Sequence, residues 1–174
     1  MAFREIDIRG LSLNPFTRFG DDWALVTAGD ESGLNTMTVS WGQMGTLWDR
    51  DVVTVYIRPS RHTKAFVDAA ERFTVSFYAP EHRRALGVLG AKSGRDSDKA
   101  AEVGFTPVFM DGTCAFAEAS MVFVCRKLYA DDIRPECMLD PAPAADHYPE
   151  FAGLDDPDYH TMYVAEVERV LVAD

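Results

Sequence analysis

Six short runs rich in β-branched and aromatic residues recur along the chain, separated by turns that contain Gly, Asp, Ser or Pro. The runs cover residues 23–29, 35–41, 51–58, 72–78, 118–129 and 159–172. Short strands at this spacing are typical of an antiparallel barrel or sandwich. A length of 174 residues with 47% hydrophobic content suits one packed core, so we predict a single mainly β domain over 1–174.

Three segments between the strands have helical features. Residues 61–72 place their apolar side chains on one helical face, and we expect Ser60 to be the N-cap. Residues 80–90 form a second candidate helix, and 93–104 read as a polar loop that enters a short third helix. Residues 131–157 are rich in Pro, Ala and Asp without a period, which predicts a long surface loop.

Several classes of protein are disfavoured by composition. The sequence contains no window of about 18 apolar residues, so we do not expect a transmembrane helix. The first residues lack the layout of a signal peptide, so we expect a cytoplasmic protein. Cys114, Cys125 and Cys137 have no metal-ligand spacing, so we expect buried free thiols and no metal site. The net charge of -11 argues against a nucleic acid or an anionic membrane as partner.

A basic stretch interrupts this acidic chain. Between Arg58 and Lys99 there are nine Lys or Arg and five Asp or Glu. Two groups of polar and basic residues lie next to predicted helix starts, where unpaired N–H groups favour anions. They are Arg58, Ser60, Arg61 and Thr63, and Lys92, Ser93, Arg95 and Lys99. The pattern indicates a small anion such as a phosphate, although ordinary solvated helix surface remains the alternative for most of these side chains.

The run at 35–41 alternates with period two, as expected of a half-buried strand. One face carries Met37, Val39 and Trp41, and the other carries the small hydroxyl residues Thr36, Thr38 and Ser40. The small face either meets water or leaves room for a flat ligand against the backbone.

The motifs occur in an order that resembles the flavin reductase-like family of the FMN-binding split barrel, particularly its flavoredoxin-like branch. They are NTMTVSWG (35–42), TVYIRPSRHT (54–63), FTVSFY (73–78), AKSGRDSDK (91–99) and YHTMYVAEVERVLV (159–172). The resemblance spans about 23–172 and is weakest over 131–157. It implies a six-stranded antiparallel Greek-key split β-barrel with short helical insertions, assembled as a homodimer with FMN near the subunit interface.

The resemblance also implies site residues. It places Asn35, Thr36, Met37, Thr38, Val39, Ser40 and Trp41 along the isoalloxazine, Arg58, Arg61 and Thr63 near the phosphate, and Lys92, Ser93 and Lys99 in a second anion-binding segment. His160 matches a position near the flavin where a nicotinamide could stack, with a structural histidine as the alternative. For Trp41, the alternative to a contact with the flavin ring is a place in the hydrophobic core. Asp96 and Asp98 are better explained as helix N-caps than as an acid/base pair.

The function that the resemblance implies is an NAD(P)H-dependent flavin reductase that passes electrons from FMN to an acceptor. No GxGxxG fingerprint follows a strand, so a nicotinamide would have to bind at the flavin face itself. Two alternatives remain open. One is a flavoredoxin-like electron carrier with a redox protein as partner, and the other is a non-enzymatic barrel that binds a phosphorylated ligand.

Overall fold

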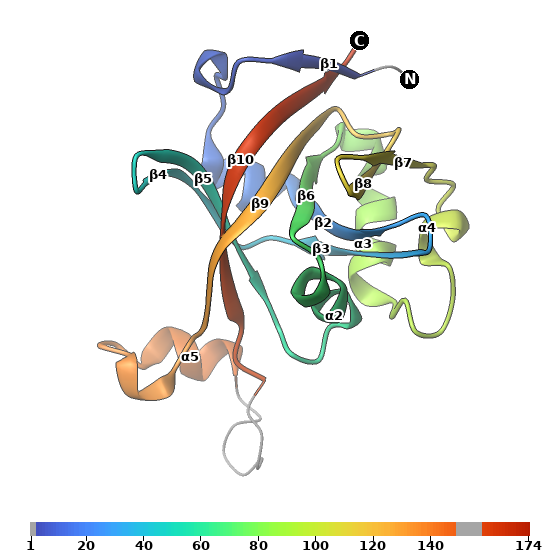
Figure 1. Cartoon of the computed structure of the whole chain (residues 1–174). Helices are drawn as coiled ribbons and strands as arrows, with labels where there is room; N and C mark the ends of the chain where they lie inside the picture. The colour runs from blue at the N-terminus through green and yellow to red at the C-terminus, as the bar shows by residue number, and fades with distance from the viewer. Residues whose placement is uncertain (1–2, 149–157) are drawn as a thin grey trace.

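The computed structural model describes residues 3–148 and 158–174, which form ten strands and several short helices (Figure 1). The strands are β1 (Phe3–Ile6), β2 (Ala24–Asp30), β3 (Gly33–Val39), β4 (Gly42–Leu47), β5 (Arg50–Ile57), β6 (Arg72–Phe77), β7 (Pro107–Met110), β8 (Thr113–Phe116), β9 (Met121–Asp132) and β10 (Thr161–Ala173). The α-helices are α1 (Pro15–Thr17), α2 (His62–Ala69), α3 (Arg83–Ala91), α4 (Lys99–Glu102) and α5 (Ala142–His147). Single turns of other helix types are η1 (Ile8–Gly10), η2 (Arg18–Asp22), η3 (Pro80–His82) and η4 (Pro135–Cys137).

Eight strands form one antiparallel sheet in the order β3-β2-β6-β9-β10-β5-β4, and β1 pairs with the far end of β10. The long strands β9 and β10 cross the middle of the molecule (Figure 1). Strands β7 and β8 form a separate hairpin. The six predicted strands correspond to β2, β3, β5, β6, β9 and β10, so the mainly β class is confirmed.

The two ends of this sheet meet without pairing. β3 and β4 lie at opposite ends of the strand order, yet only Ser40 and Trp41 separate them in sequence. The sheet must therefore curl until these two edges approach each other, and we call their junction the seam. Ten strands are described, so the predicted six strands and the Greek-key order are not confirmed. Within the described residues no ladder joins β3 to β4, so the sheet is not closed into a barrel.

Side chains are buried on both faces of the central strands. On β9, Phe123 and Cys125 belong to the core inside the curled sheet, whereas Val122 and Val124 belong to a second core on the other face. The second core is completed by α3, α4 and the β7–β8 hairpin, for example through Leu89. This two-sided burial explains why the β9 segment reads as a nearly continuous apolar run rather than a strict alternation.

The predicted helices form, but one predicted cap is wrong. Asp98 caps α4 by accepting from Ala101 N at 3.1 Å, as expected. Arg61, not Ser60, occupies the N-cap position of α2, and its side chain makes no capping bond. Ser60 instead donates from its backbone N and its Oγ to the Asp158 carboxylate, at 2.8 and 2.7 Å. Ser60 therefore ties the start of α2 to the segment that leads into β10.

The segment predicted as a structureless loop at 131–157 contains more order than its composition suggested. It includes the end of β9, η4 and α5, and it continues to the buried Tyr148. Residues 149–157 lie outside the described part of the chain. Cys137 in η4 is exposed, so the prediction of three buried thiols is wrong for this residue, while Cys114 and Cys125 are buried and free.

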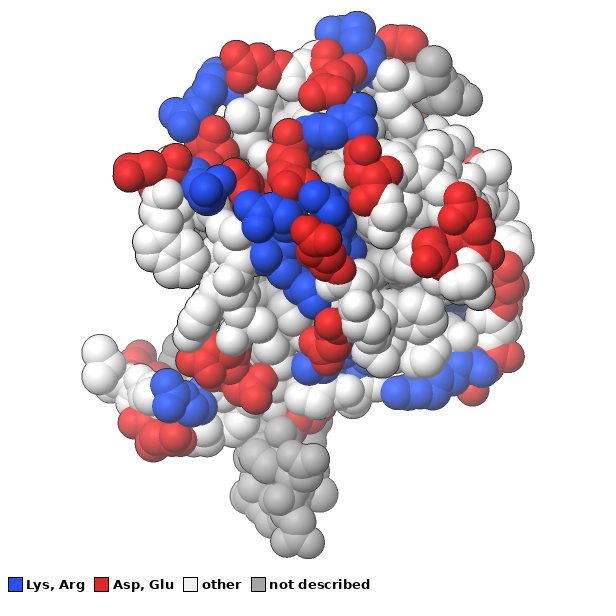
Figure 2. Space-filling view, in the orientation of Figure 1, with Lys and Arg blue, Asp and Glu red and all other residues white. Residues whose placement is uncertain are grey.

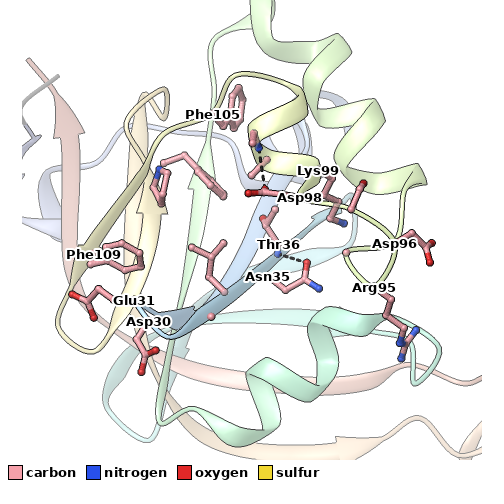
Figure 3. Close-up of a pocket in the computed structure, with 18 residues that line it drawn as sticks. Asp30, Glu31, Asn35, Thr36, Arg95, Asp96, Asp98, Lys99, Phe105 and Phe109 are labelled. Carbon is pink, nitrogen blue, oxygen red and sulfur yellow. Dashed lines mark hydrogen bonds between the residues drawn. The ribbon is translucent and has the colours of Figure 1, made fainter.

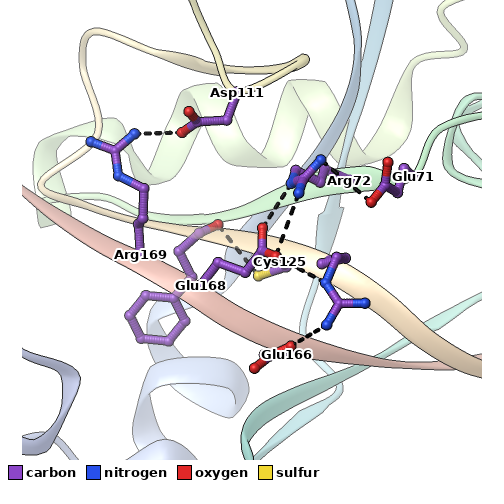
Figure 4. Close-up of polar contacts among 9 residues, drawn as sticks. Glu71, Arg72, Asp111, Cys125, Glu166, Glu168 and Arg169 are labelled. Atoms are coloured by element: carbon purple, nitrogen blue, oxygen red, sulfur yellow. Dashed lines mark hydrogen bonds and ion pairs between the residues drawn. The ribbon is translucent and has the colours of Figure 1, made fainter.

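An ion-pair ladder crosses the outer surface of the sheet (Figure 4). Glu166 on β10 pairs with Arg50 on β5 at 2.6 Å and with Arg126 on β9. Glu168 then bridges Arg126 and Arg72 at 2.9 and 2.7 Å. Arg72 and Arg126 lie directly opposite each other in the β6–β9 register, so Glu168 offsets a like-charge repulsion.

Acidic and basic side chains alternate across the middle of this face of the molecule (Figure 2). Because the ladder is exposed to water, each of its pairs contributes little to stability. Among the described residues, no helix has the length and apolar character needed to span a membrane.

Candidate functional site

A pocket of about 360 Å³ lies at the seam, and we call it the seam pocket. Its walls come from the end of β3, the link to β4, the end of β5, the start of α2, the end of α5 and the start of β10. The lining residues are Met37, Thr38, Val39, Ser40, Trp41, Tyr56, Arg58, Arg61, His147 and His160. The curl of the sheet thus brings together most of the predicted site residues, which lie far apart in the sequence.

Aromatic rings form one wall of the seam pocket. Trp41 is 36% exposed, so it is a surface ring and not a core residue. Its ring centroid lies 4.7 Å from that of His160 and 4.8 Å from that of His147. A flat ligand could extend this group by stacking on an exposed ring face.

Two guanidinium groups supply the positive charge of the pocket. Arg58 donates from Nη2 to the His147 carbonyl at 2.8 Å and lies 3.6 Å from the Asp158 carboxylate. Arg61 donates from Nη1 to the Gly90 carbonyl at 2.9 Å. A guanidinium has more N–H donors than these contacts use, so both side chains can still bind an anion.

A third cation, Lys99, lies near Arg61 at the C-terminal end of α3. Lys99 is buried and donates from Nζ to the carbonyls of Leu89 and Lys92, at 2.7 and 2.9 Å. Burial, and next the positive charge of Arg61, lower the pKa of Lys99 to about 8. Because the carbonyl end of a helix carries partial negative charge, Lys99 and Arg61 both act as C-terminal caps of α3.

The small hydroxyl face of β3 is used mainly inside the protein. The Thr36 hydroxyl lies 2.8 Å from that of Thr27 and donates to the Val26 carbonyl. The Thr38 hydroxyl donates to the Leu86 carbonyl of α3 at 2.6 Å. A Cβ placed on Gly90 would lie 3.1 Å from Thr38 Cβ, so the lack of a side chain at Gly90 lets α3 approach the strand.

Three predicted residues line a different pocket, of about 510 Å³ (Figure 3). Asn35, Thr36 and Lys99 contribute to it, together with acidic and aromatic side chains that include Glu31 and Phe109. Asn35 Nδ2 is buried and has no hydrogen-bond partner among the described residues. This pocket shares no lining residue with the seam pocket.

The remaining predicted residues line neither pocket. Thr63 is buried in α2, Lys92 is exposed and pairs with Glu102, and Ser93 Oγ accepts from Arg95 N at 3.2 Å.

Sequence reasoning missed Tyr56 and His147 in the seam pocket, as well as Tyr148 beside it. For Tyr56 the signal was present, because Val55 and Ile57 point into the core and leave Tyr56 on the same strand face as Arg58. His147 and Tyr148 follow a short helix inside a segment without periodicity, which gave no such signal.

The sequence model for the flavin reductase-like domain matches residues 16–174. The chain belongs to the flavin reductase-like family. A comparison with curated proteins finds no match. Among solved structures, similar folds are found in an FMN-binding domain of a flavin reductases-like enzyme from Shewanella baltica, a flavoredoxin from Methanosarcina acetivorans and the styrene monooxygenase flavin reductase from Pseudomonas putida.

These solved structures share the architecture of this chain at low sequence identity. The Shewanella domain has 15% identity and a TM-score of 0.67, covering 98% of this chain and 77% of its own. The flavoredoxin has 15% identity and a TM-score of 0.68, covering 88% and 69%. The styrene monooxygenase reductase has 17% identity and a TM-score of 0.62, covering 88% and 80%. The fold of this flavin reductase-like protein therefore occurs in several solved structures. At this low identity, its function has to be inferred from its own side chains.

Proposed function

We propose that this chain binds FMN in the seam pocket and acts as an NAD(P)H-dependent flavin reductase. The observation that carries the proposal is the convergence of Arg58 and Arg61 with Trp41 and His160 at one end of the curled sheet. Family membership and neighbours described as FMN-binding proteins, flavoredoxins and flavin reductases support the same ligand.

The residues present fit a planar ligand with one phosphate. Trp41 offers an exposed ring beside the backbone of Val39 and Ser40, and β3 is an edge strand whose outer side pairs with no other described strand. Unpaired edge N–H and C=O groups suit the polar rim of an isoalloxazine. Arg58 and Arg61 suit a terminal phosphate because guanidinium groups bind phosphate oxygens through charge-assisted bonds.

A further basic pocket adjoins the seam pocket and shares Arg61 with it. It measures about 430 Å³ and is lined in addition by Lys64, Arg95 and Thr161, with Asp68 and Asp132 as its acidic members. Arg61 therefore stands between the aromatic wall and a second group of cations. We place the phosphate on the Arg61 side and the ring on the Trp41 side.

FMN, when bound, supplies the hydride and electron chemistry, and the protein supplies binding and electrostatics. Trp41 and the β3 edge would orient the ring, while Arg58 and Arg61 would favour a negatively charged ligand. His160 is neutral near pH 7 and lies against Trp41, so it is placed to hydrogen bond to a ring edge rather than to pair with a phosphate.

The visible absorption spectrum of the purified protein tests for the flavin, and fluorescence titration compares FMN with riboflavin. Rapid oxidation of NADH or NADPH in the presence of FMN would support a reductase. A bound flavin with negligible nicotinamide oxidation would favour the flavoredoxin-like electron carrier. If phosphorylated ligands bind but flavins do not, the protein is a non-enzymatic phosphate-binding protein and the proposal is wrong.

We further propose that the chain is a homodimer. Large apolar side chains are exposed on the surface. They include Phe16 at 86%, which lines a hollow together with Trp41 and Gly42, and Trp48 at 59% in the turn between β4 and β5. Exposed aromatic residues of this size commonly mark contact surfaces between proteins. Light scattering should give twice the chain mass, and a monomer mass in the presence of FMN would contradict the proposal.

A further inference from the structure

We propose that Tyr148 is a positioning residue that holds His160 in the tautomer with its proton on Nε2. His160 then presents a hydrogen-bond donor to the ligand of the seam pocket. The role of that donor toward FMN rests on the proposed function, whereas the tautomer itself is a property of the protein alone.

The contact between the two side chains is short and shielded from water. The Tyr148 hydroxyl oxygen lies 2.6 Å from His160 Nδ1. Tyr148 is 6% exposed and His160 is 9% exposed. At this distance one of the two groups donates and the other accepts, so the direction of the bond determines which imidazole nitrogen carries the proton.

The chemistry of the two groups favours one direction. A phenolic O–H is a stronger donor than a neutral imidazole N–H, and an imidazole nitrogen is a stronger acceptor than a phenolic oxygen. Burial also raises the pKa of Tyr148, so its hydroxyl keeps its proton near pH 7. We therefore assign the Tyr148 hydroxyl as the donor and His160 Nδ1 as the acceptor.

His160 is held as a neutral imidazole. Burial, and next the nearby positive charge of Arg58, lower the pKa of His160 to about 4. A neutral imidazole has one donor and one acceptor nitrogen. With Nδ1 accepting from Tyr148, the proton is left on Nε2, in a residue that lines the seam pocket beside Trp41.

Contacts on its other sides hold Tyr148 in place. The Arg58 guanidinium lies 4.9 Å from the Tyr148 ring centroid, and the Tyr159 ring lies 4.5 Å from it. Arg58 also donates to the carbonyl of His147, the residue before Tyr148. One arginine thus faces the ligand pocket and holds the tyrosine that orients the histidine.

The chemical class of ligand that suits this donor is a planar ring with acceptor atoms at its edge. The carbonyl oxygens and ring nitrogens of an isoalloxazine are such acceptors. An Nε2–H donor would strengthen its bond as negative charge develops on the ring, because hydrogen bonds to charged acceptors are stronger. The opposite tautomer would place an acceptor lone pair against the same atoms.

The test is a long-range ¹⁵N–¹H NMR correlation of the histidine side chains in flavin-free protein near pH 7. His160→Gln identifies the His160 signals by their loss. In the wild type we expect His160 Nδ1 to resonate as an unprotonated nitrogen and Nε2 as a protonated one. In Tyr148→Phe the two nitrogens should shift toward an average, because neither tautomer is then favoured by a partner.

Tyr129→Phe is the matched control, since the Tyr129 hydroxyl donates to Asp131 and lies on an exposed side chain. It should leave the His160 pattern unchanged. A protonated Nδ1 in the wild type would overturn the proposal. So would an unchanged His160 pattern in a Tyr148→Phe protein that keeps its circular dichroism spectrum. If Tyr148→Phe does not fold, the wild-type pattern alone still decides the tautomer.

A second measurement addresses the ligand. Tyr148→Phe should weaken FMN binding by about three- to tenfold, as expected for loss of one well-oriented hydrogen bond, and Tyr129→Phe should not. Unchanged FMN affinity together with an altered tautomer would overturn the donor role. If the wild type itself fails to bind FMN, the proposed function is wrong, but the tautomer result stands independently.

Discussion

The Phe19 ring packs directly against the backbone of Gly42, at the corner where β3 passes into β4. A Cβ added to Gly42 would lie 2.4 Å from Phe19 Cε1, closer than two carbon atoms can approach. Phe19 is 2% exposed and makes an edge-on contact with Phe77 at 5.6 Å, so it has little room to move. The turn that brings the two sheet edges together therefore depends on a missing side chain.

Replacing Gly42 with Ala should destabilise the protein by about 1–3 kcal/mol, as expected for overpacking in a core. Urea unfolding followed by circular dichroism would measure the effect. Gly45→Ala is the matched control on the same strand, because a Cβ there would meet nothing within 4 Å. Equal stability of the two variants would show that Phe19 moves aside without cost.

The lowered pKa of His160 predicts how the stability of the protein depends on pH. Its pKa is lowered to about 4 in the folded protein, from 6.5, by burial and next by Arg58. The unfolded chain therefore binds more protons between these values, and stability should fall as the pH drops from 6.5 toward 4, by at most about 3 kcal/mol. Asp158, Arg61 and His147 also act on His160.

The control for this prediction is His160→Gln, which removes the titrating ring. Its free energy of unfolding, compared with that of the wild type at each pH, should lack this component of the acid dependence. Parallel curves for the two proteins would mean that other groups cause the acid sensitivity.

Lys99 and Lys92 should behave differently although both lie in the predicted anion-binding segment. Lys99→Ala removes the donor to two carbonyls at the end of α3 and leaves a cavity, which should cost about 2–4 kcal/mol. Lys92→Ala removes only an exposed pair with Glu102 and should cost under about 1 kcal/mol. Thermal unfolding compares them, and similar midpoints would contradict a capping role for Lys99.

Arg61 tests the placement of the phosphate. Arg61→Ala should weaken FMN binding by about one to two decades, through loss of a charge-assisted bond worth about 1.5–3 kcal/mol. Riboflavin, which has no phosphate, should bind almost as before. Arg84→Ala, an exposed arginine on α3, is the control and should affect neither ligand. Equal losses for FMN and riboflavin would place the phosphate elsewhere.

Strands whose residues alternate between apolar and polar, or that form long apolar runs, could be predicted from the sequence. Strands that are stabilised mainly by pairing with a neighbouring strand could not. β4 contains two glycines and no clear period, and it forms because β5 pairs with it along its whole length. The sequence of the β7–β8 hairpin does contain a turn signal, although no strand was predicted there. Asp111 and Gly112 have φ of 51° and 72°, which is the Asp-Gly turn typical of a hairpin.

The site was predictable to the extent that its residues lie in motifs. Trp41, Arg58, Arg61 and His160 were expected near one ligand, and the structure brings them to one pocket. The separation of Asn35 into another pocket was not foreseen, because it depends on how α3 packs across the middle of β3. Pairing between Tyr148 and His160 also depends on tertiary folding and leaves no trace in local sequence.

The seam also affects how separate copies of the chain interact. β3 packs against α2 and α3, and β4 packs against α1. In the part of the chain that the structure describes, β4 has no strand partner on its outer side, and it leads into the exposed side chains of Leu47 and Trp48. An edge of this kind can accept a strand from another molecule and so begin aggregation. A ligand or a second subunit that covers the seam would hide this edge, so the ligand-free monomer should be the species most prone to aggregate during purification and storage.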